Sequence, residues 1–130
     1  MKAICSLLLL SLFTFGAKAQ ESNHLILDKN AFRDSINAKK VLILDVRRAE
    51  EFEAGHIEQA LNFNVLDSLS FRAQVEQLDP ATPVYLYCRS GNRSGKAAVI
   101  MQEMGFQSLY DLKGGYLGWT EEETTATKNE

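Results

Sequence analysis

The fold is decided by the stretch VYLYCRSGNRS, residues 84–94. Its first four residues form an unbroken apolar run, which is typical of a strand buried on both faces of a parallel sheet. Helical spacing of apolar residues follows, which predicts a helix from about Ser94 to a C-terminal cap at Gly105. A strand, a short polar loop and a helix in this order indicate an α/β domain. The apolar residues of this helix are Ala97, Ile100, Met101 and Met104.

The same alternation of strand and helix patterns continues on both sides of this stretch. Residues 41–44 (VLIL) predict a second buried strand, and residues 108–112 (SLYDL) are a weaker candidate for a third. Such repetition predicts a parallel sheet, whose ligands collect at the carboxyl ends of the strands. Two further helices are predicted by Phe32 and Ile36 after a cap at Asp28, and by Phe71, Val75 and Leu78 behind Asp67 and Ser68.

Residues 1–19 have the layout of a secretory signal peptide. Lys2 precedes a mostly apolar run, residues 4–15, and the small-residue cleavage site Ala17-Lys18-Ala19 follows. The run is shorter than the roughly 20 residues that span a bilayer, which disfavours a membrane anchor. We therefore expect cleavage after Ala19 and export, to a periplasm-like space or out of the cell.

The rest of the chain has room for one domain, residues 22–120, followed by a polar tail, residues 121–130, that we expect to be disordered. The full chain has 14 Lys and Arg against 17 Asp and Glu, a net charge of −3, and loss of Lys2 and Lys18 with the signal peptide makes it −5. This acidic balance argues against binding to nucleic acid or to an anionic membrane surface. It does not indicate an oligomeric state.

Cys88 is the only thiol that remains once Cys5 leaves with the signal peptide, so no disulfide forms within the chain. In an oxidising compartment, a lone cysteine is either buried and inert or retained for its reactivity. We favour reactivity, because Cys88 lies where a strand ends and a helix begins. This interpretation requires that the sulfur be reachable from solvent and ionised at neutral pH.

The loop around Cys88 contains the residue types that stabilise an anion. Backbone N–H groups and the helix dipole favour negative charge there, and Gly91 and Asn92 tolerate the positive φ that a tight curl needs. Together with Arg89 and Arg93 they predict a thiolate, with a pKa of about 3.5–7.5 instead of roughly 8.5. We expect Arg93 to face the bound anion, Arg89 to face either the anion or solvent, Ser90 to stand in the turn, and Ser94 to cap the helix.

Three separated motifs resemble the rhodanese-like domain family. The loop Cys88–Ser94 is similar to the family's C-x-x-G-x-R-S loop, and GGYLGW, residues 114–119, is similar to its closing G-G-x-x-x-W element. One departure is Glu58-Gln59, where family members often have Pro-Gly, which alters a turn. The opening signature is formed by Leu44-Asp45-Val46-Arg47, Glu51-Phe52, Gly55-His56-Ile57, Ala60 and Asn62.

The resemblance implies a three-layer sandwich with a five-stranded parallel sheet flanked by helices. It also implies a sulfurtransferase in which Cys88 is the nucleophile and carries a persulfide, without a metal or an organic cofactor. Its partners are a small anionic sulfur donor and a thiol or cyanide acceptor. The substrate cradle is then formed by Arg89, Ser90, Gly91, Asn92 and Arg93, of which Arg93 contacts the donor.

Three residues of the opening signature have structural roles in this interpretation. For Arg47 we expect an ion pair with Glu51, and for His56 a hydrogen bond to a loop. Asp45 belongs to the same supporting set. We assign none of the three to catalysis.

Two other interpretations remain open at this point. Cysteine-dependent phosphatases also combine a cysteine, a backbone cradle and an arginine, but they place five residues between cysteine and arginine, whereas four separate Cys88 from Arg93. The fold is also used for binding modules, and a thiol can serve as a redox relay.

Overall fold

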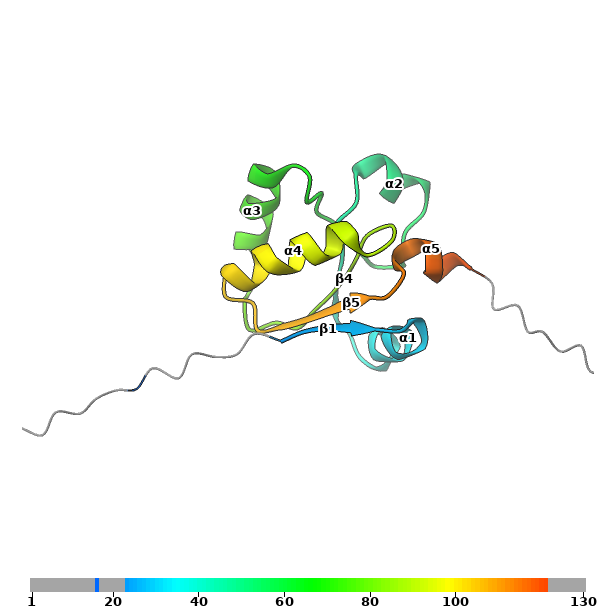
Figure 1. Ribbon diagram of the computed structural model, residues 1–130, viewed down its shortest axis with the longest axis horizontal. Helices are drawn as coiled ribbons and strands as arrows, with labels where there is room; N and C mark the ends of the chain where they lie inside the picture. The colour runs from blue at the N-terminus through cyan, green and yellow to red at the C-terminus, as the bar shows by residue number, and fades with distance from the viewer. Residues whose placement is uncertain (1–15, 17–22, 122–130) are drawn as a thin grey trace, which may run out of the picture.

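A computed structural model describes Gly16 and residues 23–121, so the predicted signal peptide and almost all of the predicted tail lie outside the described residues. The described chain forms a five-stranded sheet in the order β1-β5-β4-β2-β3, with every neighbouring pair parallel (Figure 1). This confirms the fold that the motifs implied. The strands are β1 (Asn23–Leu27), β2 (Leu42–Asp45), β3 (Leu61–Asn62), β4 (Val84–Tyr87) and β5 (Ser108–Leu112).

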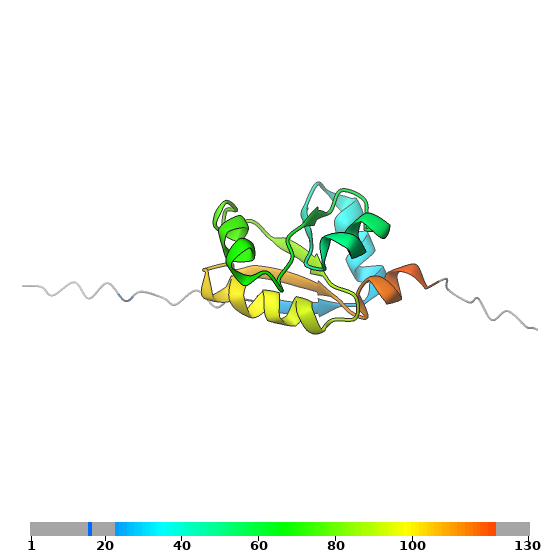
Figure 2. The ribbon, with the colours of Figure 1, turned by 90° about the horizontal axis from the view of Figure 1, so that it is seen from above.

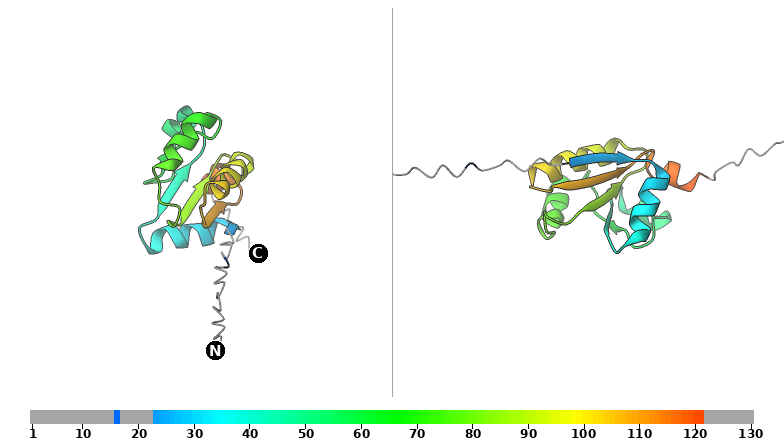
Figure 3. Two further views of the ribbon diagram at one scale, coloured as in Figure 1. Left: turned by 90° about the vertical axis from the view of Figure 1, so that its left-hand side faces the viewer. Right: turned by 90° about the horizontal axis from the view of Figure 1, so that it is seen from below.

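Helices cover both faces of the sheet, as Figure 3 shows from two sides. They are α1 (Lys29–Ala38), α2 (Ala49–Ala54), α3 (Ser68–Glu76), α4 (Asn92–Glu103) and α5 (Gly115–Thr120). Residues of α3 and α4 pack on one face, and residues of α1 and α5 pack on the other. In the described part of the chain, no helix has the length and apolar character needed to cross a membrane.

The central strand β4 divides its side chains between two cores. Val84 and Leu86 point into the cluster under α3 and α4, whereas Tyr85 and Tyr87 point into the cluster beside α1. All four residues are buried, which confirms a strand covered on both faces. Cys88 continues this alternation and points toward the α3 and α4 side.

Three helix boundaries follow the predicted capping residues. The Asp28 side chain accepts a hydrogen bond from the Ala31 N–H (2.8 Å) at the start of α1, and Asp67 does the same for α3. Gly105 adopts a φ of 94° directly after α4, as a C-terminal cap requires. Leu78 lies beyond the end of α3, so that predicted helix is shorter than expected.

The prediction that α4 begins at about Ser94 is wrong by two residues. The helix begins at Asn92, and Gly91 stands at its cap position with a φ of 112°. Because glycine reaches this conformation at little steric cost, the chain enters the helix directly from the loop. The consequence is a shorter loop, which brings the first turn of α4 closer to Cys88.

The departure Glu58-Gln59 also has a structural counterpart. The Ala60 N–H donates to the Ile57 carbonyl (3.0 Å), and Gln59 has a φ of 69°, the one positive φ among described residues other than glycine. A turn with positive φ at its third position favours Pro-Gly at its centre. The chain therefore keeps this turn without the residues that adopt it most easily.

Candidate active site

Cys88 lies at the carboxyl end of β4, with its sulfur against the first turn of α4. The Gly91 N–H donates to Sγ at 3.0 Å, and the Ser94 hydroxyl lies 3.4 Å from the same atom. The loop curls around the sulfur because Gly91 has a positive φ and the helix follows at once. Of the N–H groups predicted to form the cradle, that of Gly91 thus contacts the sulfur.

The outer side of this loop is held by the start of α5, which lies beside it in Figure 2. The Tyr116 N–H donates to the Cys88 carbonyl (2.8 Å) and the Leu117 N–H donates to the Arg89 carbonyl (3.1 Å). Gly115 makes this approach possible, since a Cβ atom there would lie 2.5 Å from the Arg89 backbone. The closing Gly-Gly pair thus supports the loop that bears Cys88.

The surroundings of the sulfur favour its charged form. Burial raises the pKa of the Cys88 thiol, but hydrogen bonds from the Ser94 side chain and from the N–H groups of Ser94, Gly91 and Ser90 more than offset it. The net result is a pKa below that of an ordinary thiol. The lowered pKa that we expected for Cys88 agrees in direction with these hydrogen bonds.

Solvent access is lower than the catalytic interpretation requires. Cys88 is 1% exposed and belongs to the core cluster under α4. The alternative of an inert buried thiol accounts for this burial, but it does not account for a polar donor set aimed at the sulfur. Arg89 and Ser90, the next two residues of the loop, are exposed.

Of the two loop arginines, Arg93 differs from the expectation. The Arg93 guanidinium forms two hydrogen bonds with the Glu51 carboxylate, at 2.7 and 2.9 Å, and acts on Cys88 through its charge. This pairing lowers the pKa of Glu51 to about 2. Arg89, by contrast, has no ion-pair partner among the described residues. The cation left available to an anion is therefore Arg89, and Asn92 is exposed beside it.

Ser94 is not the helix cap that its position suggested. It lies in the third position of α4, fully buried, and its hydroxyl donates to the Gly91 carbonyl at 3.1 Å. Because α4 begins earlier than expected, the Ser94 side chain faces the sulfur instead of the helix terminus. Ser94 therefore contacts the sulfur of Cys88 from the first turn of α4.

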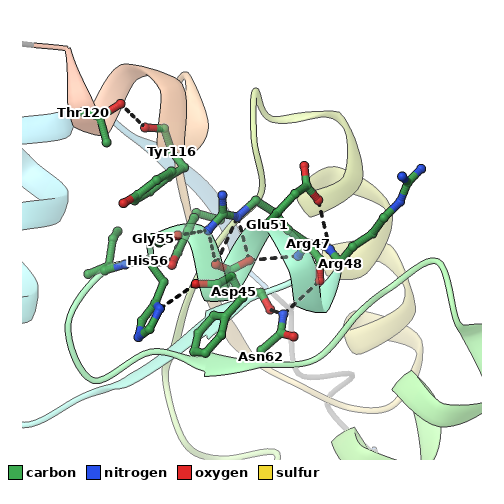
Figure 4. Close-up of polar contacts among 12 residues, drawn as sticks. Asp45, Arg47, Arg48, Glu51, Gly55, His56, Asn62, Tyr116 and Thr120 are labelled. Atoms are coloured by element: carbon green, nitrogen blue, oxygen red, sulfur yellow. Dashed lines mark hydrogen bonds and ion pairs between the residues drawn. The ribbon is translucent and has the colours of Figure 1, made fainter.

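Asp45 and Arg47 form a buried ion pair beside the cradle (Figure 4). Arg47 Nη2 lies 2.6 Å from Asp45 Oδ2, and Nε lies 3.0 Å from both carboxylate oxygens. The expected pair between Arg47 and Glu51 is wrong: Arg47 lies in a bend before α2, which begins at Ala49, so helical spacing does not bring the two side chains together. Burial lowers the pKa of Arg47, but the hydrogen bond and the charge of Asp45 together raise it by more. The net pKa is therefore raised, and the guanidinium remains charged.

The rest of the opening signature surrounds this pair. Arg47 Nη2 also donates to the Gly55 carbonyl (2.7 Å), and its guanidinium lies 4.3 Å from the centre of the Tyr116 ring. The Asn62 amide donates to the carbonyls of Asp45 (3.1 Å) and Arg47 (2.9 Å). These contacts join the segment after β2 to β3 and α5.

The partner of His56 belongs to a helix, whereas a loop was expected. Its Nδ1 atom lies 2.8 Å from the carbonyl of Phe52 in α2, and its ring stacks on the Phe52 ring at 3.7 Å. The residues that sequence reasoning left out of the site are Gly115 and Tyr116. The Gly-Gly pair was a visible signal for both, since it marks a close backbone approach.

Other possible sites do not involve Cys88. In residues 23–121, no group of three or more His, Cys, Asp or Glu side chains is placed to hold a metal ion. A groove between the end of α1 and the segment 56–59 is lined by Lys39, Lys40, His56 and Trp119, among others, and Cys88 does not line it.

Comparison with known proteins gives a family match over the whole domain. Residues 28–122 match the model of the Rhodanese-like domain family. A thiosulfate sulfurtransferase GlpE from Shewanella oneidensis is 35% identical over 95 residues, which covers 73% of this chain and 91% of that protein. A tRNA uridine(34) hydroxylase from Pelagibacter ubique is 30% identical over 106 residues, but this chain spans only 35% of its length.

Solved structures show the same fold. A rhodanese-like domain protein from Staphylococcus aureus superposes with a TM-score of 0.65 at 23% identity, covering 76% of this chain and 94% of that one. The sheet order and the helices on both faces are thus shared with known structures.

Proposed function

This chain belongs to the rhodanese-like domain family, and from that premise we propose that it is a sulfurtransferase whose Cys88 carries the transferred sulfur as a persulfide. One observation supports the proposal above all: the sulfur of Cys88 is contacted by the Gly91 N–H and the Ser94 hydroxyl at the start of a helix. Such donors stabilise a thiolate and also a persulfide anion. An inert core cysteine has no need of them.

The proposed reaction has two half reactions. The Cys88 thiolate attacks the outer sulfur of a thiosulfate-like donor, the bond between the two donor sulfurs breaks, and sulfite leaves with the electron pair. A thiolate or cyanide acceptor then attacks the outer sulfur of the persulfide, and Cys88 returns to the thiolate. Covalent transfer of this kind predicts ping-pong kinetics.

Burial of Cys88 restricts the donors that the site accepts. Because Cys88 is only 1% exposed, a small anion with a terminal sulfur reaches it more easily than a bulky substrate. Of the two loop arginines, Arg89 is the one without an ion-pair partner among the described residues, so we assign it the attraction of the donor. Thiosulfate and mercaptopyruvate are the two donors to compare.

The proposal is tested by incubating the purified domain with thiosulfate and measuring its intact mass. We expect a gain of one sulfur atom in the wild type and none in Cys88→Ala. Addition of cyanide should then remove the sulfur. An equal gain by both proteins, or no gain with any donor, would contradict the assignment.

Two related outcomes separate the rival activities. Hydrolysis of an aryl phosphate that disappears in Cys88→Ala would favour a phosphatase. Oxidation of Cys88 without sulfur loading from any donor would favour a redox relay. The spacing of four residues between Cys88 and Arg93, and the commitment of Arg93 to Glu51, weigh against phosphate binding.

A further inference from the structure

The groove on the α1 side of the sheet takes no part in the proposed chemistry of Cys88. It encloses about 930 Å³ and is lined by the end of α1, the segment 56–59 and Trp119 of α5. Small-molecule sites in proteins typically have volumes of roughly 300–1,000 Å³. The groove is therefore of a size that a small ligand fills.

The bottom of the groove is apolar. Ile43 and Ile57 line it and are 5% and 3% exposed, so only a small part of each residue faces the open space. Ile36 of α1 and Trp119 of α5 are half-buried and add apolar surface. Because burial of apolar surface favours binding, a ligand that fits this groove has an apolar body.

Two cations at the groove have no partner. Lys39 and Lys40 directly follow α1 and are exposed, and neither side chain forms an ion pair or a hydrogen bond with another described residue. Among the described residues that line the groove, Glu58 is the one acid, so the lining is net positive even with His56 neutral. The chain as a whole has a net charge of −3. A local excess of cations on an acidic protein favours an anionic ligand.

The aromatic residues that line the groove are held in place by neighbouring side chains. The Nδ1 atom of His56 lies 2.8 Å from the Phe52 carbonyl, and the two rings stack at 3.7 Å. Trp119 packs edge to face with Phe32, with ring centres 6.1 Å apart, and the Arg33 guanidinium lies 5.2 Å from the centre of the Trp119 ring. A preformed groove has little conformational entropy to lose when a ligand binds, which favours affinity.

We propose that this groove binds a small organic anion, whose apolar body lies over Ile43 and Ile57 and whose acidic group is held by Lys39 and Lys40. Carboxylates, sulfonates and phosphate esters with an apolar portion share this chemistry. Glu58, in the segment on the other side of the groove, repels the acidic group and so directs it toward the end of α1. The site does not use Cys88, so the inference is independent of the proposed sulfur transfer.

The test compares two fluorescent probes, anilinonaphthalene sulfonate and the neutral phenylnaphthylamine, which has the same rings without the sulfonate. Trp119 is the one tryptophan of the chain, so quenching of its fluorescence reports binding at the groove itself. We expect the double variant Lys39→Gln, Lys40→Gln to bind the sulfonate about tenfold more weakly and the neutral probe as the wild type does. Glu58→Gln should bind the sulfonate more tightly, because the repelling acid is removed.

Lys96→Gln is the matched control. Lys96 is exposed on α4, which covers the other face of the sheet, so the same loss of charge there should leave the binding of both probes unchanged. Cys88→Ala should also bind the sulfonate as the wild type does, whatever it does to sulfur loading.

Three results would overturn the inference. One is that the sulfonate does not quench Trp119. The second is that the wild type and the double lysine variant bind the sulfonate equally. The third is that the double variant loses the neutral probe to the same extent, or that Lys96→Gln weakens the sulfonate as much, because the lysines would then not hold an acidic group in the groove.

Discussion

Two segments leave the carboxyl edge of the sheet side by side, after the paired strands β2 and β4. In the segment after β2, the charged side chains of Asp45 and Arg47 satisfy each other, and the remaining donors of Arg47 are used by a carbonyl and an aromatic ring. In the segment after β4, the Gly91 N–H donates to the sulfur of Cys88, and the Ser94 hydroxyl lies 3.4 Å from that sulfur. In the segment after β2, the charged side chains bind each other, whereas in the segment after β4, polar groups contact the sulfur of Cys88.

This difference indicates which segment supports the fold and which supports the chemistry. Removing one partner of a buried ion pair leaves an uncompensated charge, which is strongly destabilising. Removing a thiol that serves only as a nucleophile should alter stability much less. Stability and sulfur loading should therefore respond to opposite sets of substitutions.

The largest effect on stability is expected for Asp45→Asn. This substitution keeps the size of the side chain but leaves Arg47, whose side chain is 5% exposed, without its buried counterion. We expect a loss of about 3–5 kcal/mol in the free energy of unfolding. Urea denaturation of the wild type and the variant measures it.

Cys88→Ala is the matched control on the other segment. We expect it to lower the free energy of unfolding by no more than about 1.5 kcal/mol, since one small buried atom is removed. It should abolish sulfur loading completely. Equal destabilisation by the two variants would show that the segments do not differ in the way their contacts indicate.

An intermediate effect is expected for Gly115→Ala. The added Cβ atom would lie 2.5 Å from the Arg89 carbonyl carbon and oxygen, and backbone atoms cannot move aside as a flexible side chain can. We expect a cost of about 1–3 kcal/mol in the free energy of unfolding, with slower alkylation of Cys88 because α5 no longer holds the loop. Thermal unfolding and the rate of reaction with iodoacetamide measure the two effects.

Gly118→Ala tests whether the close approach is responsible. Gly118 lies in the same helix, and its nearest contact for a Cβ atom is the Lys113 carbonyl oxygen at 3.7 Å, an ordinary distance. We expect wild-type stability and reactivity. A similar loss in both variants would point to helix α5 itself and not to its contact with the loop.

Local sequence patterns were sufficient to predict β4, α4 and the loop between them. The apolar run of β4, the spacing of α4 and the residues around Cys88 lie together in the chain, and both periodicities are strong there. The edges of the sheet were not predicted from pattern. In β1, the exposed Leu25 and Ile26 are adjacent, which disrupts alternation, and β3 has only two residues.

Long-range partners could not be read from local spacing. Arg47 and Glu51 are four apart, which suggests a helical pair, but α2 begins only at Ala49. Glu51 instead meets Arg93, 42 residues further along the chain. The contact between Asp111 and His24 likewise spans 87 residues and exists only because β1 pairs with β5.

The smallest effect is expected at the pair Arg93–Glu51, which joins the two segments. Its side chains are 18% and 29% exposed, so solvent screening limits its contribution to about 0.5–1 kcal/mol. The pKa of Glu51 is lowered from 4.5 to about 2, chiefly by Arg93, so the folded state favours the charged carboxylate. This stability is fully present above the unfolded pKa and is lost as the pH falls through about 2.

Glu51→Gln should therefore be less stable than the wild type at neutral pH, and the difference should shrink between pH 4.5 and about 2. The variant also frees the charge of Arg93 beside Cys88, so loading from anionic thiosulfate should accelerate more than alkylation by neutral iodoacetamide. Denaturation at several pH values and the ratio of the two rates measure these effects. If the ratio of loading rate to alkylation rate is unchanged, the charge of Arg93 does not act on the donor, even when Glu51 no longer binds it. Arg93 would then have a structural role, like the contacts of Asp45 and Arg47.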